Sequence, residues 1–226
     1  MIPWTELGRA TVPGEGTALV LARRDDEFVI RVGATPLMSS RMHASEDALA
    51  TGACERLRSV ANARVLVGGL GMGFTLAAAL GALPATAQVV LCELVPAIVE
   101  WNRGPLAELA GRPLDDARVG VHVGDVAERV RAANAEFDAI LLDVDNGPSG
   151  LTRSANDRLY GAAGLRAAAR ALRPNGVLAV WSGAPDAAFS QRLAQSGFDI
   201  EEVPVRAHAG KGSRHVLWFA RRAARD

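Results

Sequence analysis

Two acidic side chains stand where a reacting group would be needed. The apolar run 137–143 ends in Asp143, and Asp145 follows two residues later in an Asn-Gly-Pro loop. Carboxyls at this spacing on a loop can bind an ammonium group, relay a proton or hold a metal ion. An Asn-Gly turn with flanking solubilising acids is the structural alternative. We predict a catalytic role for both acids, because the strand before them is expected at the switch point of a sheet.

A glycine-rich turn supplies a second candidate site. Gly68, Gly69, Gly71 and Gly73 lie within six residues, between the apolar run 64–68 and a helix-like run. Glycine lets the backbone turn tightly and approach a ligand, and the helix that follows offers free N–H groups. The turn therefore predicts ligand binding, with an unliganded strand–helix connection as the alternative.

Two further acids end neighbouring apolar runs. Glu93 lies 24 positions after Gly69, where a carboxylate can accept both hydroxyls of a ribose. Asp125 follows the next run, where it can accept the exocyclic amine of adenine. It can equally cap the helix expected over 125–133, because Asp is favoured at such positions. Both readings of Asp125 stay open.

The glycine spacing argues against a dinucleotide-binding fold. The strict Gly-x-Gly-x-x-Gly pattern requires a glycine at position 74, which is Phe74. Gly-x-Gly-x-Gly is the commoner form for S-adenosyl nucleosides. The acidic loop after the fourth strand also has no necessary role in nicotinamide binding.

Alternating strands and helices must position these residues. Expected strands are 64–68, 87–93, 118–123, 137–143 and 176–181, and expected helices are 73–82, 96–103, 125–133, 156–172 and 186–196. Near-continuous apolar strands that alternate with helices predict a parallel sheet covered on both faces. Two last strands, 198–205 and 214–221, have a short glycine-containing connection, which predicts an antiparallel hairpin at the edge.

The first 44 residues have a different pattern. Runs 17–22 and 27–32 flank a charged turn and predict a β-hairpin. Ser45 is expected to cap a helix from Glu46 to about Ala61. We therefore expect a short N-terminal β element over 1–44 and a nucleoside-binding catalytic domain over 45–226.

Taken together, residues from about 43 to 182 resemble the spermidine synthase family, which has the S-adenosylmethionine methyltransferase fold. The matching segments are VLVGGLGMG (65–73), VVLCELVPAIVEWNR (89–103), VGDVAERV (123–130), FDAILLDVDNGPSGL (137–151) and ALRPNGVLAVW (171–181). The resemblance implies a class I methyltransferase-like, Rossmann-like α/β fold. Its mostly parallel sheet would have seven strands and a small N-terminal β element, through which two copies would form a homodimer.

The resemblance also implies roles for residues of the site. Glu93 would hold the ribose and Asp125 the adenine of a sulfonium donor, either S-adenosylmethionine or its decarboxylated form. Asp143 would help to deprotonate the accepting amine, with Asp145 orienting it. Tyr160 falls near an aromatic position of the family downstream of the acidic loop.

Two departures from the family concern the reacting end of the site. Gly71 replaces an acid that normally helps to bind the aminopropyl ammonium of the decarboxylated donor. Asp145 stands one place early, and Asn146 occupies a position where an acid is typical. The nucleoside half of the site is intact, whereas the aminopropyl and acceptor ends differ.

Other side chains are candidates for the acceptor pocket. His43 and Glu46 lie where the family places groups that face the substrate. Trp181 ends the fifth strand on the ligand side of the sheet and can wall the pocket. The four histidines are scattered with no i, i+4 pair, so we expect no metal site.

Composition excludes several functions. Lys plus Arg and Asp plus Glu each number 25, so the formal net charge is zero and the basic excess of a duplex-binding protein is missing. No apolar run reaches the roughly 18 residues of a membrane span. The two cysteines, Cys54 and Cys92, cannot build a disulfide framework. We expect a cytoplasmic protein that binds neither nucleic acid nor membrane.

Three functions remain open. The first is aminopropyl transfer to a small amine, as in polyamine synthesis, and Asp143 with Asp145 favours it. The second is methyl transfer from intact S-adenosylmethionine to a small molecule, which Gly71 favours. The third is a non-catalytic subunit that binds a nucleoside without turnover.

Overall fold

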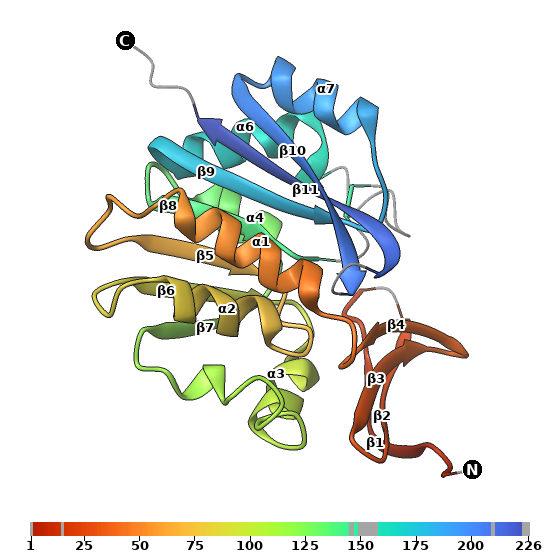
Figure 1. The fold of residues 1–226 in the computed structure, drawn as a ribbon. Helices are drawn as coiled ribbons and strands as arrows, with labels where there is room; N and C mark the ends of the chain where they lie inside the picture. Colours follow the sequence, from red (N-terminus) through yellow and green to blue (C-terminus); the bar gives the residue numbers. More distant parts are fainter. Residues whose placement is uncertain (1, 15, 145–146, 149–157, 209–210, 223–226) are drawn as a thin grey trace.

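The computed structural model describes residues 2–14, 16–144, 147–148, 158–208 and 211–222 of the chain. Its elements form two sheets, one of four strands and one of seven. The smaller sheet is N-terminal and lies beside the carboxyl ends of the parallel strands of the larger one (Figure 1). Within the described residues, no helix combines the length and the apolar character that a membrane crossing requires.

The N-terminal sheet is an antiparallel meander in the order β1-β2-β3-β4. Its strands are β1 (Thr5–Thr11), β2 (Ala18–Arg24), β3 (Glu27–Val32) and β4 (Thr35–Ser39). The predicted hairpin is confirmed as β2 and β3, with Leu21 opposite Ile30. The flanking strands β1 and β4 were missed, because β1 is mostly exposed and β4 has only five residues, so neither has a clear apolar alternation.

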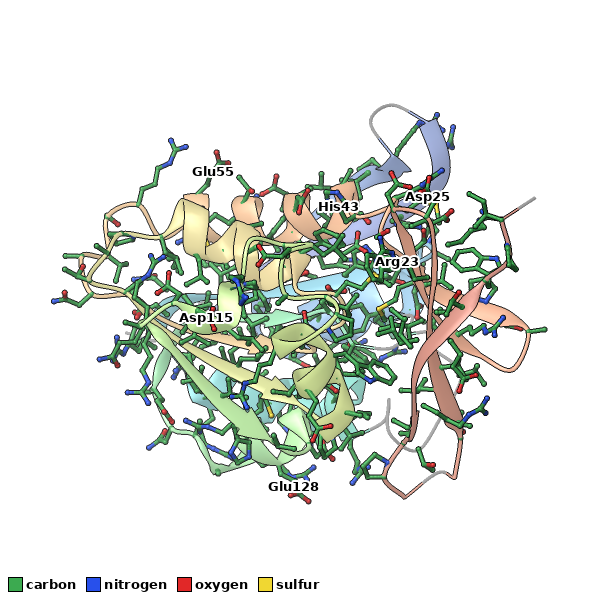
Figure 2. All side chains as sticks on the ribbon, turned by 90° about the horizontal axis from the view of Figure 1, so that it is seen from below. Arg23, Asp25, His43, Glu55, Asp115 and Glu128 are labelled. Atoms are coloured by element: carbon green, nitrogen blue, oxygen red, sulfur yellow. The ribbon has the colours of Figure 1, made fainter. Side chains whose placement is uncertain are left out.

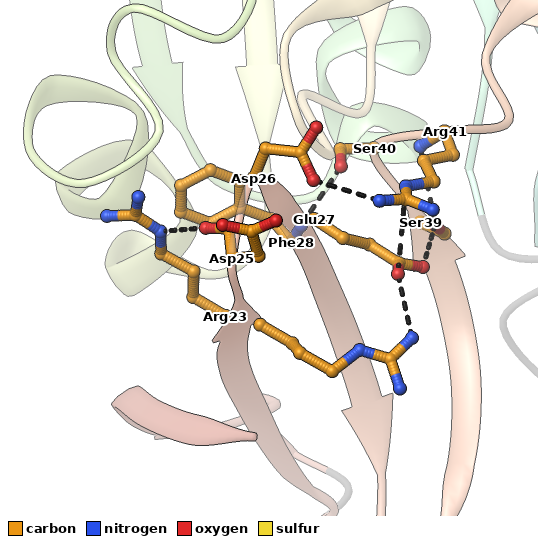
Figure 3. A network of polar contacts seen from close by, with 9 residues as sticks. Arg23, Asp25, Asp26, Glu27, Phe28, Ser39, Ser40 and Arg41 are labelled. Carbon is orange, nitrogen blue, oxygen red and sulfur yellow. Dashed lines mark hydrogen bonds and ion pairs between the residues drawn. The ribbon is translucent and has the colours of Figure 1, made fainter. Parts of the chain in front are cut away.

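A polar network ties the β2–β3 turn to the end of β4 (Figure 3). Arg41 donates a 2.9 Å hydrogen bond to Asp26, and Glu27 accepts from Arg24 at 3.0 Å. The Ser40 hydroxyl accepts from the backbone N–H of Phe28 at 2.9 Å. The Arg41 guanidinium holds the pKa of Asp26 below its usual value. These contacts fix the chain just before it enters the first helix.

The larger sheet has the order β10-β11-β9-β8-β5-β6-β7. Its parallel strands are β5 (Arg64–Gly68), β6 (Gln88–Glu93), β7 (Val119–Val123), β8 (Phe137–Leu142) and β9 (Leu172–Ser182). β11 (Lys211–Arg222) pairs antiparallel with both β9 and β10 (Phe198–His208). The seven-stranded, mostly parallel sheet of the S-adenosylmethionine methyltransferase-like fold, ending in an antiparallel hairpin, is therefore confirmed.

Helices cover both faces of this sheet, as the apolar strands predicted. On one face pack α1 (Ala44–Glu55), α2 (Phe74–Ala82) and α3 (Pro96–Arg103), and on the other α4 (Val126–Ala132), α6 (Ala162–Ala171) and α7 (Ala187–Gln195) (Figure 1). A short 3₁₀ helix, η1 (Pro113–Asp115), precedes β7. Every residue of the central strand β8 is buried. Successive residues of β5 alternate between the two cores, with Val65 in one and Leu66 in the other.

The start of α1 corrects one prediction. The helix begins at Ala44 after His43, and no side chain caps it, so the capping role expected for Ser45 is wrong. Ser45 is fully buried, and its hydroxyl bonds side chains instead. The helix also ends at Glu55 rather than near Ala61, because a turn follows it. The boundary near residue 45 between an N-terminal element and a catalytic domain stays a prediction.

Candidate active site

A cavity of about 620 Å³ opens between the two sheets. Its floor is formed by the carboxyl ends of β5, β6 and β8 and the loops that follow them. Its other wall comes from the N-terminal sheet, including Ile30, Leu37 and Met38. The smaller sheet is fixed there by a close contact, since a Cβ on Gly8 of β1 would lie 2.5 Å from Trp101 Nε1 of α3. The cavity is thus a pocket at the edge where a parallel sheet is expected to bind its ligand.

The glycine turn lines this cavity, as predicted. Gly69 has a φ of +90°, and a Cβ there would lie 2.2 Å from the carbonyl oxygen of Asp143. Only glycine permits this approach of two backbones. Gly71 has a φ of +52° and also faces the cavity, whereas Gly68 ends β5 and Gly73 precedes α2, both behind the cavity lining.

Glu93 is a buried carboxyl of the cavity lining. Its side chain is 5% exposed and lines the cavity at the end of β6. One carboxylate oxygen accepts from the backbone N–H of Leu70 and the other from that of Val95, each at 2.8 Å. The carboxylate is therefore held in one orientation by the glycine turn and by the start of α3, which suits it to receive ribose hydroxyls.

Asp125 is both a helix cap and a part of the cavity lining. It is the N-cap of α4, where its Oδ1 accepts from the backbone N–H of Ala127 at 2.8 Å. It also lines the cavity, and its Oδ2 lies 3.3 Å from Arg158 Nη1. Capping and cavity lining thus occur together. The contact with adenine stays a prediction.

Asp143 follows β8 at the centre of the sheet, as predicted, and lines the cavity. Its Oδ2 accepts a 2.5 Å hydrogen bond from the hydroxyl of Thr75 on the first turn of α2. Burial, together with the charge of Glu46, raises the pKa of Asp143 from 3.8 to about 7, against the opposing effect of the Thr75 bond. The carboxyl therefore exchanges its proton near neutral pH, as a general base requires.

Glu46 of α1 is the second carboxyl at this end of the cavity. Burial raises its pKa, while the hydrogen bond from Ser45 lowers it. The charge of Glu46 also contributes to the raised pKa of Asp143. Two carboxyls in one cavity oppose each other's ionisation, which favours the binding of a positively charged group.

Of the other described residues that were predicted for the acceptor pocket, one lines the cavity and two do not. Trp181 lines the cavity, as expected. His43 lies behind the wall at the start of α1 (Figure 2), where its ring stacks on Phe74 with centroids 4.0 Å apart and Nδ1 lies 2.7 Å from Asp47. Tyr160 is only 2% exposed and packs edge-on against Phe189 in the core, away from the cavity. Asp145 lies outside the described residues.

Several residues of the site were not found from the sequence. Thr75 gave no signal, because a lone threonine in a helix has no distinctive pattern. His215 lies 170 positions further along the sequence than its partner Ser45, so no local pattern connects the two. Met38 fills the space in front of Gly71, where a Cβ would lie 3.3 Å from its sulfur. In the sequence, only Gly71, which replaces an acid of the resembled family, indicated that this part of the site differs.

The charge of the cavity favours a cationic ligand. Its described lining contains four carboxyls, of Glu46, Glu93, Asp125 and Asp143, and one guanidinium, of Arg158, which is paired with Asp125. In the described part of the chain, no three His, Cys, Asp or Glu side chains are grouped as a metal site would require. The carboxyl pair at Asp143 and Glu46 is thus suited to a positively charged organic group.

Comparison with known families agrees with this geometry. The model of the spermine/spermidine synthase domain matches residues 52–191. The chain belongs to the spermine/spermidine synthase family. The matched region contains the glycine turn, Glu93, Asp125 and Asp143, and it ends within α7.

Relatives of known activity share part of the chain. A polyamine aminopropyltransferase of Mycobacterium tuberculosis (strain CDC 1551 / Oshkosh) is 34% identical over 105 residues, which are 45% of this chain and 19% of that protein. Putrescine N-methyltransferase 2 of Nicotiana attenuata is 36% identical over 116 residues, 51% of this chain and 29% of that protein. The chain thus spans less than a third of the length of these relatives.

Solved structures of the family have the same fold. Spermidine synthase from Thermotoga maritima superposes with a TM-score of 0.76 at 18% identity, covering 97% of this chain and 74% of that one. A spermidine synthase in complex with the transition state analogue AdoDATO gives a TM-score of 0.75 at 18% identity, covering 97% and 73%. The N-terminal sheet is included in these superpositions, because nearly the whole chain is covered.

Proposed function

We propose that this chain is a transferase that moves the aminopropyl group of decarboxylated S-adenosylmethionine to a small amine. The observation that carries the proposal is the pair Asp143 and Glu46, two carboxyls that line one cavity together with the glycine turn. Such a pair can bind an ammonium group and accept its proton. The similarity to a polyamine aminopropyltransferase supports this assignment.

In this proposal the nucleoside half of the cavity holds the donor. Glu93 receives the ribose hydroxyls, the glycine turn passes close to the donor, and Asp125 contacts the adenine. A sulfonium carbon is already activated, since attack on it releases a neutral thioether. The protein therefore contributes mainly by aligning nitrogen, carbon and sulfur, which is a proximity effect.

The acceptor half must produce a free amine. Amine pKa values lie near ~10, so the acceptor arrives as an ammonium ion. Asp143, with its pKa raised to about 7, accepts one proton from it. The neutral nitrogen then attacks the donor carbon while the carbon–sulfur bond breaks. Trp181 and the apolar N-terminal sheet limit the access of water to this place.

The charge of the cavity favours the decarboxylated donor over the intact one. Intact S-adenosylmethionine would add a carboxylate to a lining with four carboxyls and one guanidinium that already has a partner. Opposing this, Met38 stands before Gly71, so the described turn has no acid for the aminopropyl ammonium. That observation, with the putrescine N-methyltransferase relative, favours methyl transfer to an amine as the second candidate.

Calorimetric titration tests the proposal first. The purified protein is titrated with S-adenosylmethionine, its decarboxylated form and methylthioadenosine, and turnover is then measured with putrescine and related diamines. Tighter binding of the decarboxylated donor, with transfer to a diamine, supports the proposal. Tighter binding of the intact donor moves the assignment to methyl transfer, and binding without turnover indicates a nucleoside-binding subunit. The cytoplasmic location and the homodimer stay predictions.

A further inference from the structure

A chain of three side chains leads from the cavity to the C-terminal hairpin. The hydroxyl of Ser45 donates a 2.6 Å hydrogen bond to Oε2 of Glu46, which lines the cavity. The same hydroxyl lies 3.0 Å from Nδ1 of His215 on β11. Ser45 is fully buried and His215 is half-buried. These contacts join the first helix to a strand near the end of the chain.

We propose that Glu46, Ser45 and His215 form a proton relay that empties the Glu46–Asp143 carboxyl pair after the acceptor amine has lost its proton. The inference rests on the proposed function, because it concerns the proton that amine alkylation releases. The reaction of an ammonium ion with a sulfonium ion gives an alkylated ammonium ion, a neutral thioether and one proton. That proton has to leave the site before the next turnover.

The contacts define each transfer along the relay. Protonated Glu46 donates to the oxygen of Ser45, and the hydroxyl proton of Ser45 passes to Nδ1 of neutral His215. The imidazolium then releases the proton on its other nitrogen, Nε2, to water. Afterwards Ser45 donates to the Glu46 carboxylate and Nδ1–H donates to Ser45. That is the arrangement observed for the hydroxyl, and the donor role of Nδ1 then follows. The imidazole must therefore return to the Nε2–H tautomer, by exchanging its protons with water, before it can accept again.

The surroundings match the proton affinities along the path. Burial lowers the pKa of His215, whose ring packs edge-on against Trp181 with centroids 4.8 Å apart. Glu46 faces Asp143 across the cavity and has His43 and Asp47 beside it on α1. Burial raises the pKa of Glu46 and of Asp143 toward that of an imidazole. Burial thus shifts the pKa values of Glu46 and His215 toward each other.

The two carboxyls of the pair accept hydrogen bonds from different hydroxyls. The hydroxyl that bonds Asp143 belongs to Thr75, which is 2% exposed on α2. Ser45, in contrast, connects Glu46 onward to a half-buried imidazole. Glu46 is therefore the exit of the pair, and Ser45 and His215 are positioning residues that act through it.

The kinetic test compares Ser45→Ala and His215→Ala with the intact chain. Each variant should lower kcat about tenfold or more, leave the KM for the donor unchanged, and alter the pH profile of kcat. Added imidazole should restore turnover to His215→Ala. Ser190→Ala is the matched control, because Ser190 joins the ring nitrogen of Trp218 to Glu202 in the same way on α7. Equal loss of kcat in this control, or no rescue by imidazole, overturns the relay.

A second measurement does not depend on turnover. Nuclear magnetic resonance gives the pKa of His215 in the intact chain, Glu46→Gln, Ser45→Ala and the double variant. The relay predicts that Glu46→Gln changes this pKa more when Ser45 is present than when it is replaced. An equal change in both backgrounds overturns the proposal. If no amine is alkylated but the coupling is found, the proposed function fails while the Glu46–Ser45–His215 connection stands.

Discussion

Replacing Asp143 by Asn should stabilise the protein at high pH, although the residue is proposed to act in catalysis. In the folded chain the pKa of this carboxyl is about 7, against its ordinary value of 3.8. The folded state therefore binds the Asp143 proton more tightly than the unfolded state does. This contribution to stability is fully present below pH 3.8 and is lost as the pH rises through about 7.

The size of the effect follows from the two pKa values. At 1.36 kcal/mol for each pH unit, the interval from 3.8 to about 7 corresponds to about 4 kcal/mol. Asp143 is half-buried rather than fully enclosed, so water reduces the effect to about 2–4 kcal/mol. Asn keeps the shape of the side chain and can still accept from Thr75, but it never carries the charge. Its melting temperature at about pH 8 should exceed that of the intact chain by roughly 5–15 °C.

Thermal unfolding at about pH 4 and about pH 8 measures this difference. The advantage of Asp143→Asn should shrink to below about 1 kcal/mol at the lower pH, where the carboxyl is neutral in the folded state and only about half ionised in the unfolded state. Asp138→Asn is the matched control. Asp138 is also buried, but its Oδ2 accepts from the Arg64 N–H and from Arg173, each at 2.7 Å. This variant should be less stable than the intact chain at both pH values.

An Asp143→Asn variant that is no more stable than the intact chain at about pH 8 would refute the reasoning. The carboxyl would then be ionised without cost, and a base with a pKa near neutrality would no longer be available at this position. An equal gain at both pH values would also contradict it, because the gain would then come from packing rather than from charge.

Three further predictions concern the donor end of the cavity. Glu93→Gln should weaken binding of methylthioadenosine by about 1.5–3 kcal/mol in calorimetry, the range of hydrogen bonds to charged groups, and an unchanged affinity would remove Glu93 from the ribose site. Gly69→Ala should destabilise the chain by several kcal/mol in denaturant unfolding, because its Cβ would lie 2.2 Å from the Asp143 carbonyl oxygen. Gly14→Ala, with a φ of +82° but open space, should lose only about 1 kcal/mol, and equal losses would contradict the close approach. Gly71→Asp combined with Met38→Ala should shift the ratio of affinities toward the decarboxylated donor, and an unchanged ratio would show that position 71 does not face the donor tail.

The sequence predicted the order of the main elements because apolar strands and amphipathic helices alternate clearly along it. Strand β5 and helix α3 have the predicted limits. The N-terminal strands β1 and β4 were missed because β1 is mostly exposed and β4 has only five residues, so no alternation of apolar residues marks them. The cap of α1 was predicted wrongly, because the hydroxyl of Ser45 bonds the side chains of Glu46 and His215 instead of the backbone.

The site was predictable from the sequence wherever a polar residue directly follows a strand. Glu93, Asp125 and Asp143 all line the cavity, because the carboxyl ends of parallel strands meet at one edge. Tyr160 was predicted for the acceptor pocket only from its position in the chain, whereas its ring packs in the core. Thr75, Met38 and His215 depend on contacts between distant segments, which a single sequence does not encode in a local pattern.

The two hydroxyls behind the carboxyl pair lower the cost of an acidic cavity. An unpaired buried carboxylate is costly, and its pKa rises until it takes up a proton. Thr75 and Ser45 each donate to one carboxyl and so oppose this rise, while Glu46 opposes the ionisation of Asp143. An ammonium ion that binds beside the pair would in turn favour the ionised carboxyls. In our proposal, the proton that this ammonium ion then loses to the pair leaves through Ser45 and His215.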